Sequence, residues 1–433
     1  EFSGEVGMAL RGVLGLNARN HLYTSRYNPR SAKRVANSKL LTKSTLRKVK
    51  LPVPKLYRVF RRMEEVDKFD WTRLAESFVI KPNRGFGGEG IVVIEKGGEW
   101  AGEWVDTNGV TWKVADFKLH IEDILEGRFA VDDVPDIAFV EERIPIHPSF
   151  SKYAYAGAPD IRVIVFNRVP VMAMLRLPTK ESHGRANLYQ GAVGAGIDLA
   201  TGVTTYGIWH EREVKFVPGT RRRLFGVKMP DWYEVLRLAV RCQEETNLGY
   251  LGADIVLHPD KGPMVLELNA QPGLKIQLCN RVGLLARLRR VEGLKVKSVE
   301  HGIKIAQALF ADPKVAEQTG TGVRTIGVFE EVEVVSLKTA DPVQVKAKVD
   351  TGAYSSSVDR QLAESLGLLS PDNVVTKKGV KSALGREERS VVAVSFKLAG
   401  KKVKTVATIS DRSRLKRPMI IGRRDLGGFL VRG

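Results

Sequence analysis

The stretch from residue 252 to 274, GADIVLHPDKGPMVLELNAQPGL, has an apolar run on each side of the turn HPDKG. This pattern predicts two antiparallel strands joined by a hairpin. Glu267 and Asn269 are two residues apart, so their side chains leave the same face of the second strand. Asp254 lies on the first strand and can complete the cluster. The three side chains offer the hard oxygen ligands that Mg²⁺ takes when it also binds nucleotide phosphates.

The alternative is that these three residues are polar groups on a solvent-facing side of the sheet. Asp254 and Glu267, however, lie inside apolar runs. A carboxylate buried among apolar side chains must be paired or bound to a metal. We therefore favour the metal site.

A second stretch, VIKPNRGFGGEGIVVI (79–94), predicts a strand, a glycine-rich loop and another strand, with Lys81 at the end of the first strand. The glycines that would let backbone N–H groups approach an anion are Gly85, Gly87, Gly88 and Gly90. Rossmann and Walker loops differ, because their glycines open a helix. A glycine-rich hairpin without any ligand has the same pattern, so this loop is weak support by itself.

Together these motifs resemble the ATP-grasp superfamily, and within it the RimK-like alpha-L-glutamate ligases, over about residues 11–310. The stretches RGVLGLNARN (11–20) and NSKLLTKSTLRKVKLPVPKLYRV (37–59) resemble the opening of that branch. The resemblance implies an α+β ATP-grasp fold with ATP and Mg²⁺ as cofactors. It also implies a ligase that activates a carboxylate as an acyl phosphate, which an amine then attacks to form an amide.

The resemblance further implies roles for individual residues. Lys39 and Lys81 would bind the ATP phosphates, with Lys81 also near the adenine, and the loop 85–90 would close over the β- and γ-phosphates. The strand FVEERI would bring Glu141 and Glu142 near the adenine and ribose. The transferring phosphate and the acceptor carboxylate would be met by Arg162, Arg176, Arg185 and Asn187. The ligands of Mg²⁺ would be Asp254, Glu267 and Asn269.

Near the other end of the chain, the strand-like run VQVKAKV (343–349) leads into Asp-Thr-Gly at residues 350–352. This triplet alone is only suggestive. A later run contains IIG (420–422), and an apolar pair followed by Gly packs beneath the aspartate loop in retropepsin-like proteins. Residues 326–433 thus resemble the retropepsin-like domains found beside glutamate ligases, sometimes labelled ATP-dependent zinc proteases. No HExxH or other zinc-ligand spacing supports the zinc label.

This second resemblance implies that Asp350 is a catalytic carboxylate. Retropepsins build one site from two identical chains, each contributing one Asp-Thr-Gly across a two-fold axis. The paired carboxylates share a proton and activate water. The single triplet therefore predicts a homodimer, at least of this domain. The alternative is a protease fold that binds a peptide without cutting it.

These motifs predict an ATP-grasp unit followed by a small all-β barrel-like domain. We assign residues 1–60 to the N-terminal segment of the ligase, 61–311 to the ATP-grasp domain, 312–325 to a linker and 326–433 to the retropepsin-like domain. Helices are expected at about 38–48, 230–247 and 298–311, with strands and hairpins filling the rest of 76–275.

The composition of the chain limits the classes of molecule that we expect it to bind. The net charge is +20, from 69 Lys and Arg against 49 Asp and Glu, and such a surface attracts polyanions. The basic runs lack aromatic interleaving and nucleic-acid signatures, so we expect an amino acid and an acidic peptide or protein acceptor instead. The cysteines Cys242 and Cys279 form no CxxC motif, and no apolar run is long enough for a bilayer. The sequence thus predicts a cytoplasmic protein without membrane contact.

Two other functions fit the same sequence. The first is a ligase that makes a small-molecule amide, with a C-terminal domain that only dimerises. The second is a non-enzymatic protein that binds polyanions through its basic surface. The intact Asp, Glu and Asn set argues against the second.

Overall fold

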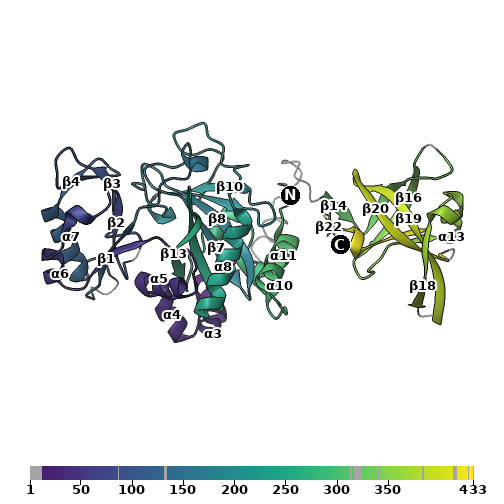
Figure 1. Ribbon diagram of the computed structural model, residues 1–433, viewed down its shortest axis with the longest axis horizontal. Helices are drawn as coiled ribbons and strands as arrows, with labels where there is room; N and C mark the ends of the chain where they lie inside the picture. The colour runs from purple at the N-terminus through teal and green to yellow at the C-terminus, as the bar shows by residue number, and fades with distance from the viewer. Residues whose placement is uncertain are drawn as a thin grey trace. The chain divides into compact units, whose positions relative to one another are not determined.

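The computed structural model describes residues 12–432, apart from residues 86, 131–133, 313–314, 316–323, 340, 383–384, 413–416 and 428. The chain divides into two compact units, residues 1–315 and 316–433 (Figure 1). Each unit has its own hydrophobic core. Residues 313–314 and 316–323 of the expected linker lie outside the described residues. The domain limits therefore stay predictions.

The first unit is built on a larger sheet of antiparallel strands in the order β11-β10-β9-β8-β7-β12-β13. The bounds are Asp160–Phe166 (β7), Val169–Leu177 (β8), Val193–Ile197 (β9), Thr204–Trp209 (β10), Arg212–Val214 (β11), Tyr250–His258 (β12) and Gly262–Asn269 (β13). Every residue of β7 and β12 is buried. Helices α8 (Trp232–Thr246) and α11 (Val299–Phe310) pack on this sheet (Figure 1). They confirm the helices expected at 230–247 and 298–311.

A smaller sheet has the order β1-β6-β2-β3-β4-β5. Its bounds are Leu56–Phe60 (β1), Phe78–Pro82 (β2), Val92–Gly97 (β3), Glu103–Asp106 (β4), Thr111–Lys113 (β5) and Ala138–Glu142 (β6). Strands β2 and β3 form the predicted hairpin around the glycine-rich loop. Helices α6 (Met63–Asp67) and α7 (Val114–Leu125) pack beside them.

Helix α7 corrects the expectation of strands alone in this part of the chain. Phe117, Ile121 and Ile124 are buried and recur at spacings of four and three residues. The ring of Phe117 stacks on Trp71, with ring centroids 5.1 Å apart. Residues at this spacing share one face of a helix, so the sequence did carry the signal.

The N-terminal segment is helical and leads to the smaller sheet. It consists of α2 (Leu16–Ala18), the π-helical η1 (Arg19–Thr24), α3 (Ser25–Tyr27), α4 (Arg30–Ala36) and α5 (Lys39–Lys48). Helix α5 confirms the helix expected at 38–48, and the Ser38 hydroxyl caps it by accepting from the backbone N–H of Leu41. After β13 come α9 (Ile276–Asn280) and α10 (Leu284–Val291). Among the described residues, no helix combines the length and apolarity needed to cross a membrane.

The second unit is a closed barrel. The strands β15-β16-β21-β17-β20-β19 form a ring, because β15 pairs with both β16 and β19. The bounds in this unit are Arg324–Gly327 (β14), Phe329–Val334 (β15), Val343–Asp350 (β16), Ser357–Asp359 (β17), Val374–Ser382 (β18), Gly385–Leu398 (β19), Lys401–Ser410 (β20), Met419–Gly422 (β21) and Phe429–Arg432 (β22). The predicted barrel is confirmed, and helix α13 (Arg360–Ser365) is an addition to it.

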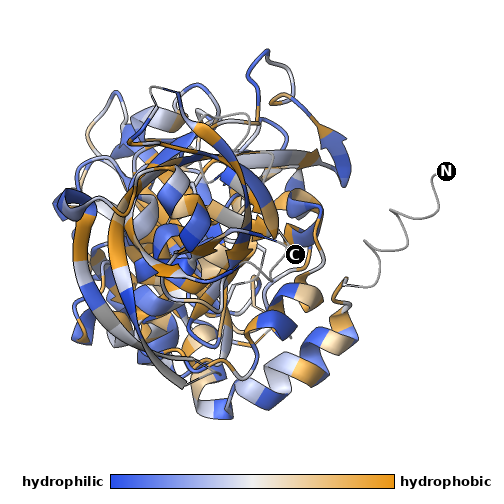
Figure 2. Cartoon of the chain, turned by 90° about the vertical axis from the view of Figure 1, so that its right-hand side faces the viewer, coloured by the Kyte–Doolittle hydropathy of each residue, from blue (hydrophilic) through white to orange (hydrophobic). Residues whose placement is uncertain are grey.

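Alternation along the barrel strands places the core. In β16, Val345, Ala347 and Val349 are buried, whereas Lys346 between them is exposed. Figure 2 shows this pattern as alternating hydrophobic and hydrophilic bands along strands. A period of two residues fills the barrel interior and leaves charged side chains outside.

Candidate functional site

The predicted metal ligands lie together on the last two strands of the larger sheet. Strands β12 and β13 pair with Asp254 opposite Glu267. The side-chain amide of Asn269 donates to Oδ2 of Asp254 at 3.2 Å and lies 3.5 Å from Oε1 of Glu267. Asp254 is fully buried, whereas Glu267 and Asn269 are partly exposed. The hairpin therefore gathers the three side chains into one cluster.

Two arginines bind the carboxylate of Asp254. Arg162 donates from Nε to Oδ1 at 2.7 Å and from Nη2 to Oδ2 at 2.6 Å. Arg176 donates to Oδ2 at 2.7 Å and makes two further bonds of 2.5 Å to Asp160. Burial disfavours the charged form of Asp254, but both guanidinium groups outweigh it and hold the pKa of this carboxyl well below its usual range. Asp254 therefore organises the two predicted arginines.

The cluster has the donor chemistry that Mg²⁺ takes. Mg²⁺ bound with a nucleotide keeps water and phosphate oxygens and needs only one or two carboxylates from the protein. Both oxygens of Asp254 already accept from arginines, whereas no ion pair involves Glu267 in the described part of the chain. No group of three or more His, Cys, Asp or Glu among the described residues could hold a metal by itself. Glu267 and the amide of Asn269 thus fit an ion that is shared with a nucleotide, whereas Asp254 lies beside them with its oxygens already bonded to arginines.

Lys39 lies between this cluster and the glycine-rich loop. Its Nζ donates to the carbonyl oxygen of Gly85 at 2.9 Å. Burial lowers the pKa of Lys39, and the negative charge of nearby Glu267 opposes that shift. The start of α5 is tied to the same segment, because the N–H groups of Lys39 and Leu40 donate to the backbone and side chain of Asn83. The Lys39 ammonium therefore connects the loop with the carboxylates.

The glycine-rich loop requires glycine for steric reasons. A Cβ on Gly85 would lie 2.3 Å from Cγ of Pro82. Gly90 has φ of +68°, and a Cβ there would lie 2.6 Å from Cγ of Phe129. Neither position accepts a side chain unless the neighbouring proline or phenylalanine shifts. Phe86, within the loop, lies outside the described residues.

The predicted residues Arg185 and Asn187 lie against this loop. The side-chain amide of Asn187 donates to the carbonyl oxygen of Gly87 at 2.6 Å. A Cβ on Gly88 would be 3.6 Å from Cδ of Arg185. The segment around residues 185–190 thus contacts the same loop as the lysine on α5.

Glu141 of the smaller sheet forms ion pairs with two lysines, one on β2 and one on α5. Lys81 Nζ is 2.6 Å from Oε1 of Glu141, and Lys43 Nζ is 2.7 Å from Oε2. Burial opposes the ionised form, but these lysines keep the pKa of Glu141 below its ordinary value. Sequence reasoning missed Lys43, although it follows Lys39 by four residues and so shares its helix face.

Glu142 points to the other face of β6. It accepts a bond of 3.0 Å from the backbone N–H of Lys55 and pairs with Lys261. Neighbouring residues of a strand alternate between faces. The two glutamates that the resemblance implies for the adenine and ribose therefore do not share a side.

A small cavity of about 40 Å³ adjoins the arginines. Its lining residues are Arg162, Met174, Arg176, Asn187, Leu188, Tyr189, Gly273 and Lys275. Lys275 lies over the exposed Tyr189 ring, with Nζ 3.9 Å from the centroid. Neither residue was singled out from the sequence. Their positions in the sequence could have indicated them, because Lys275 closely follows the strand that carries Asn269, and Tyr189 closely follows Asn187.

In the second unit, Asp350 ends β16 and lies opposite Gly422 of the parallel strand β21. Its Oδ1 accepts from the backbone N–H groups of Gly352 at 3.0 Å and Ala353 at 3.2 Å. Its Oδ2 lies 3.7 Å from Nζ of Lys348, and the side chain is 30% exposed. The loop thus fixes one oxygen of the carboxylate and leaves the other facing a partly open position.

The IIG run packs against this loop. The N–H of Gly422 donates to Oγ of Ser356 at 3.1 Å, and the N–H of Arg423 donates to the carbonyl oxygen of Ala353 at 2.8 Å. A Cβ on Gly422 would lie 2.5 Å from the backbone of Ser355. Asp425 accepts from the Ser356 hydroxyl at 2.5 Å. Residues 422–425 therefore brace the loop that follows Asp350.

Comparison with known proteins identifies the first unit. A family model described as sugar-transfer associated ATP-grasp matches residues 18–293. This chain belongs to that family. The match confirms the ATP-grasp resemblance, but it does not decide the RimK-like branch or the amino acid. No curated protein matches the sequence.

Solved structures resemble each unit separately. The ATP-grasp ligase PsnB, in a complex with a phosphomimetic variant of its minimal precursor, Mg and ADP, is 18% identical over 60% of this chain and 61% of PsnB, with a TM-score of 0.30. A Legionella pneumophila protein of unknown function (DUF785) is 18% identical over 25% of this chain and 92% of its own, with a TM-score of 0.17. The retroviral protease-like domain of Ddi1 from Leishmania major is 25% identical over 23% and 74%, with a TM-score of 0.19. These scores are low, so the ATP-grasp assignment rests on the family model and the barrel on its strand order.

Within the ATP-grasp unit the predicted residues form two adjoining groups. One group is the carboxylates and arginines of the larger sheet, around Asp254. The other is the lysines of α5 and β2 with the glycine-rich loop. Lys39 links the groups. Its ammonium donates a hydrogen bond to the loop, and the negative charge of Glu267 acts on its pKa.

Proposed function

We propose that the ATP-grasp unit is an ATP-dependent carboxylate–amine ligase that works with Mg²⁺. The observation that carries this proposal is the meeting of Asp254, Glu267 and Asn269 next to a partly buried lysine, Lys39, that bonds the glycine-rich loop. Such a site combines candidate metal ligands with cations and a glycine-rich loop. These are the parts that phosphoryl transfer needs for positioning and charge neutralisation.

The proposed reaction joins a carboxylic acid to an amine. A carboxylate oxygen of one substrate attacks the γ-phosphorus of ATP, and ADP leaves. The amine nitrogen of the second substrate attacks the carbonyl carbon of the resulting acyl phosphate. The bond between this carbon and the phosphate oxygen breaks, inorganic phosphate leaves with the electron pair, and the nitrogen loses a proton. Bound Mg²⁺ would neutralise charge on the phosphate oxygens.

The residues of this chain supply binding and orientation. Glu267 and Asn269 would hold the ion, while Lys39 and Lys81 would contact phosphate oxygens. Arg162 donates hydrogen bonds from Nε and Nη2 to Asp254, so its remaining N–H groups can bind the transferring phosphate or the acceptor carboxylate. Closure of the loop against the segment around Asn187 would keep water from the acyl phosphate.

For substrates, we propose glutamate as the first amino acid to test and an acidic peptide or protein as the acceptor. The net charge of +20 supports an acidic partner. The family description, sugar-transfer associated, keeps a small-molecule acceptor as the second candidate. The RimK-like branch is part of the same proposal.

The proposal predicts ADP release that depends on a particular amino acid. The measurement is ADP formation from Mg²⁺-ATP with each of the twenty amino acids, alone and with a peptide that ends in Glu. Release that needs both one amino acid and the peptide supports a peptide ligase. Release with an amino acid alone supports a small-molecule amide, and no release with any pairing contradicts the substrate classes proposed here.

We also propose that the barrel is an aspartic peptidase domain that acts as a homodimer. The loop that fixes Oδ1 of Asp350 and the bracing by residues 422–425 support it. In a dimer, two Asp350 carboxylates would share one proton, and one of them would take a proton from the attacking water. A peptide-binding barrel without cleavage is the alternative.

The Asp350→Asn variant is expected to lose peptide cleavage completely while it keeps the same oligomeric state. The amide cannot accept the proton of the attacking water, yet it retains the shape of the side chain. Cleavage of the ligation product and of denatured casein, followed by mass spectrometry between acidic and neutral pH, is the measurement. Asp372→Asn, at an exposed position of the same unit, is the control. If the wild-type protein cuts neither substrate, the barrel only binds peptides or dimerises.

A further inference from the structure

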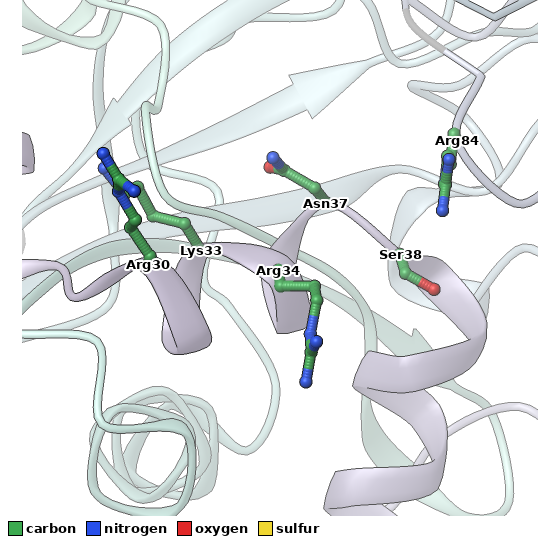
Figure 3. Close-up of a pocket in the computed structure, with 6 residues that line it drawn as sticks. All are labelled: Arg30, Lys33, Arg34, Asn37, Ser38 and Arg84. Atoms are coloured by element: carbon green, nitrogen blue, oxygen red, sulfur yellow. The ribbon is translucent and has the colours of Figure 1, made fainter. Parts of the chain in front are cut away.

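A pocket of about 550 Å³ lies beside α4 and the start of α5. Its lining residues are Arg30, Lys33, Arg34, Asn37, Ser38 and Arg84 (Figure 3). It shares no lining residue with the small cavity at the arginine cluster. None of the nucleotide or metal residues discussed above lines it.

One helix and one loop build this pocket. Arg30, Lys33 and Arg34 lie on α4, and Asn37 is the residue that follows its end. Figure 3 shows Arg30, Lys33 and Asn37 directed to one side and Arg34 directed to the other, with Arg84 reaching toward Ser38 from a separate segment. The cations therefore come from two walls rather than from a single run of sequence.

The pocket concentrates unpaired positive charge. No Asp or Glu is among its lining residues. In the described part of the chain, none of its four cations takes part in an ion pair. Four like charges around one hollow repel each other, and an anionic ligand would relieve that repulsion. The charge thus points to an anion with more than one charged group.

The donors favour separate carboxylates over a phosphate or a nucleic acid. The first N–H groups of α5 are already used, because those of Lys39 and Leu40 donate to Asn83 and that of Leu41 donates to Ser38. A compact phosphate would therefore find no free N–H group at the start of α5. No aromatic side chain lines the pocket, so bases have no surface to stack on. Cations on two walls suit carboxylates on successive residues.

The pocket adjoins the glycine-rich loop. The hydroxyl of Ser38 donates to Oδ1 of Asn83 at 2.9 Å. Arg84 directly precedes Gly85, whose carbonyl oxygen accepts from Lys39. A chain bound in the pocket would thus lie next to the loop that Lys39 holds.

We propose that this pocket binds an acidic stretch of peptide, with its side-chain carboxylates on Arg30, Lys33, Arg34 and Arg84. Its role as the docking site of the ligase acceptor rests on the proposed function, whereas the binding itself does not. The pocket would hold the acceptor while the acceptor's reacting group enters the nucleotide site.

The test is the binding of fluorescein-labelled hexaglutamate to the full-length protein at low salt, followed by fluorescence anisotropy. Arg30→Gln/Lys33→Gln should weaken binding about tenfold, because each lost contact is that of a partly exposed ion pair. Arg221→Gln/Arg222→Gln removes the same charge from an exposed segment of the same unit and should weaken it much less. Arg84→Gln, from the other wall, should weaken binding about threefold, because it removes one such contact instead of two.

The outcomes separate the alternatives. If both double variants weaken the binding of hexaglutamate equally, the attraction is general electrostatics, and the proposal that the pocket binds the peptide is wrong. The protein could instead bind tripolyphosphate or a single-stranded oligonucleotide, with the same dependence on Arg30, and not bind hexaglutamate. That result would contradict the proposal that the ligand is an acidic peptide. If hexaglutamate binds as expected but no amino acid pairing releases ADP, the pocket stands and the ligase proposal fails. If ligation occurs, Arg30→Gln/Lys33→Gln should raise KM for the peptide and leave kcat unchanged.

Discussion

The Glu267→Gln variant is expected to release ADP about 100-fold more slowly than the wild-type protein, or slower still. Removal of this carboxylate takes away the negative ligand that the proposed ion needs, and the phosphate charge that the ion offsets is largest in the transition state. Binding of the nucleotide should weaken less than turnover. The measurement is steady-state ADP formation at saturating Mg²⁺-ATP with the best substrate pair.

Stability should hardly change in this variant, and that makes the test selective. Glu267 is partly exposed, its contact with Asn269 is long at 3.5 Å, and no ion pair involves it among the described residues. Glutamine preserves the shape and one acceptor oxygen. Glu64→Gln, at an exposed position of the same unit, is the control and should keep full activity. Full activity in Glu267→Gln would exclude this glutamate as a metal ligand.

The Asp254→Ala variant is expected to lower the free energy of unfolding of the first unit by about 3–5 kcal/mol. Asp254 is fully buried and accepts from both Arg162 and Arg176. Without it, Arg162 keeps no carboxylate partner among its described contacts, whereas Arg176 retains Asp160. A buried guanidinium without a partner costs far more than the lost bonds alone.

Tryptophan fluorescence in urea can measure this change in the first unit alone, because all six tryptophans precede residue 316. Asp67→Ala removes a mostly exposed aspartate and should cost less than about 1 kcal/mol. Asp254→Leu combined with Arg162→Met should recover part of the loss, since both charges then leave together. A loss below about 1 kcal/mol in Asp254→Ala would show that water or local rearrangement replaces the carboxylate.

The sequence predicted the hairpins well. The alternation around the HPDKG turn implied that Asp254, Glu267 and Asn269 could meet, and the register of β12 and β13 brings them together. The sequence also predicted the glycine-rich loop between two strands, because glycines occur where the backbone must turn or pack closely. Helix α7 was missed although its apolar spacing indicated a helix, because neighbouring strand patterns dominated the interpretation.

Other features depend on residues that lie far apart in the chain. The sequence suggested that Arg162 and Arg176 bind a ligand, but their common partner Asp254 emerges only when β7, β8 and β12 lie side by side. Lys43 of α5 likewise becomes part of the site through Glu141, which lies on β6, far along the chain from Lys43.

By itself, then, the sequence determined the hairpins, the glycine positions and the types of side chain that reach the site, because these follow from the spacing of neighbouring residues. Only the tertiary structure decided which charges pair and which stay unpaired, as in the pocket around Arg30 and Arg84. The physical reason is that ion pairs depend on distances of a few ångströms between distant segments. Those distances follow from strand order and packing, which no local pattern specifies.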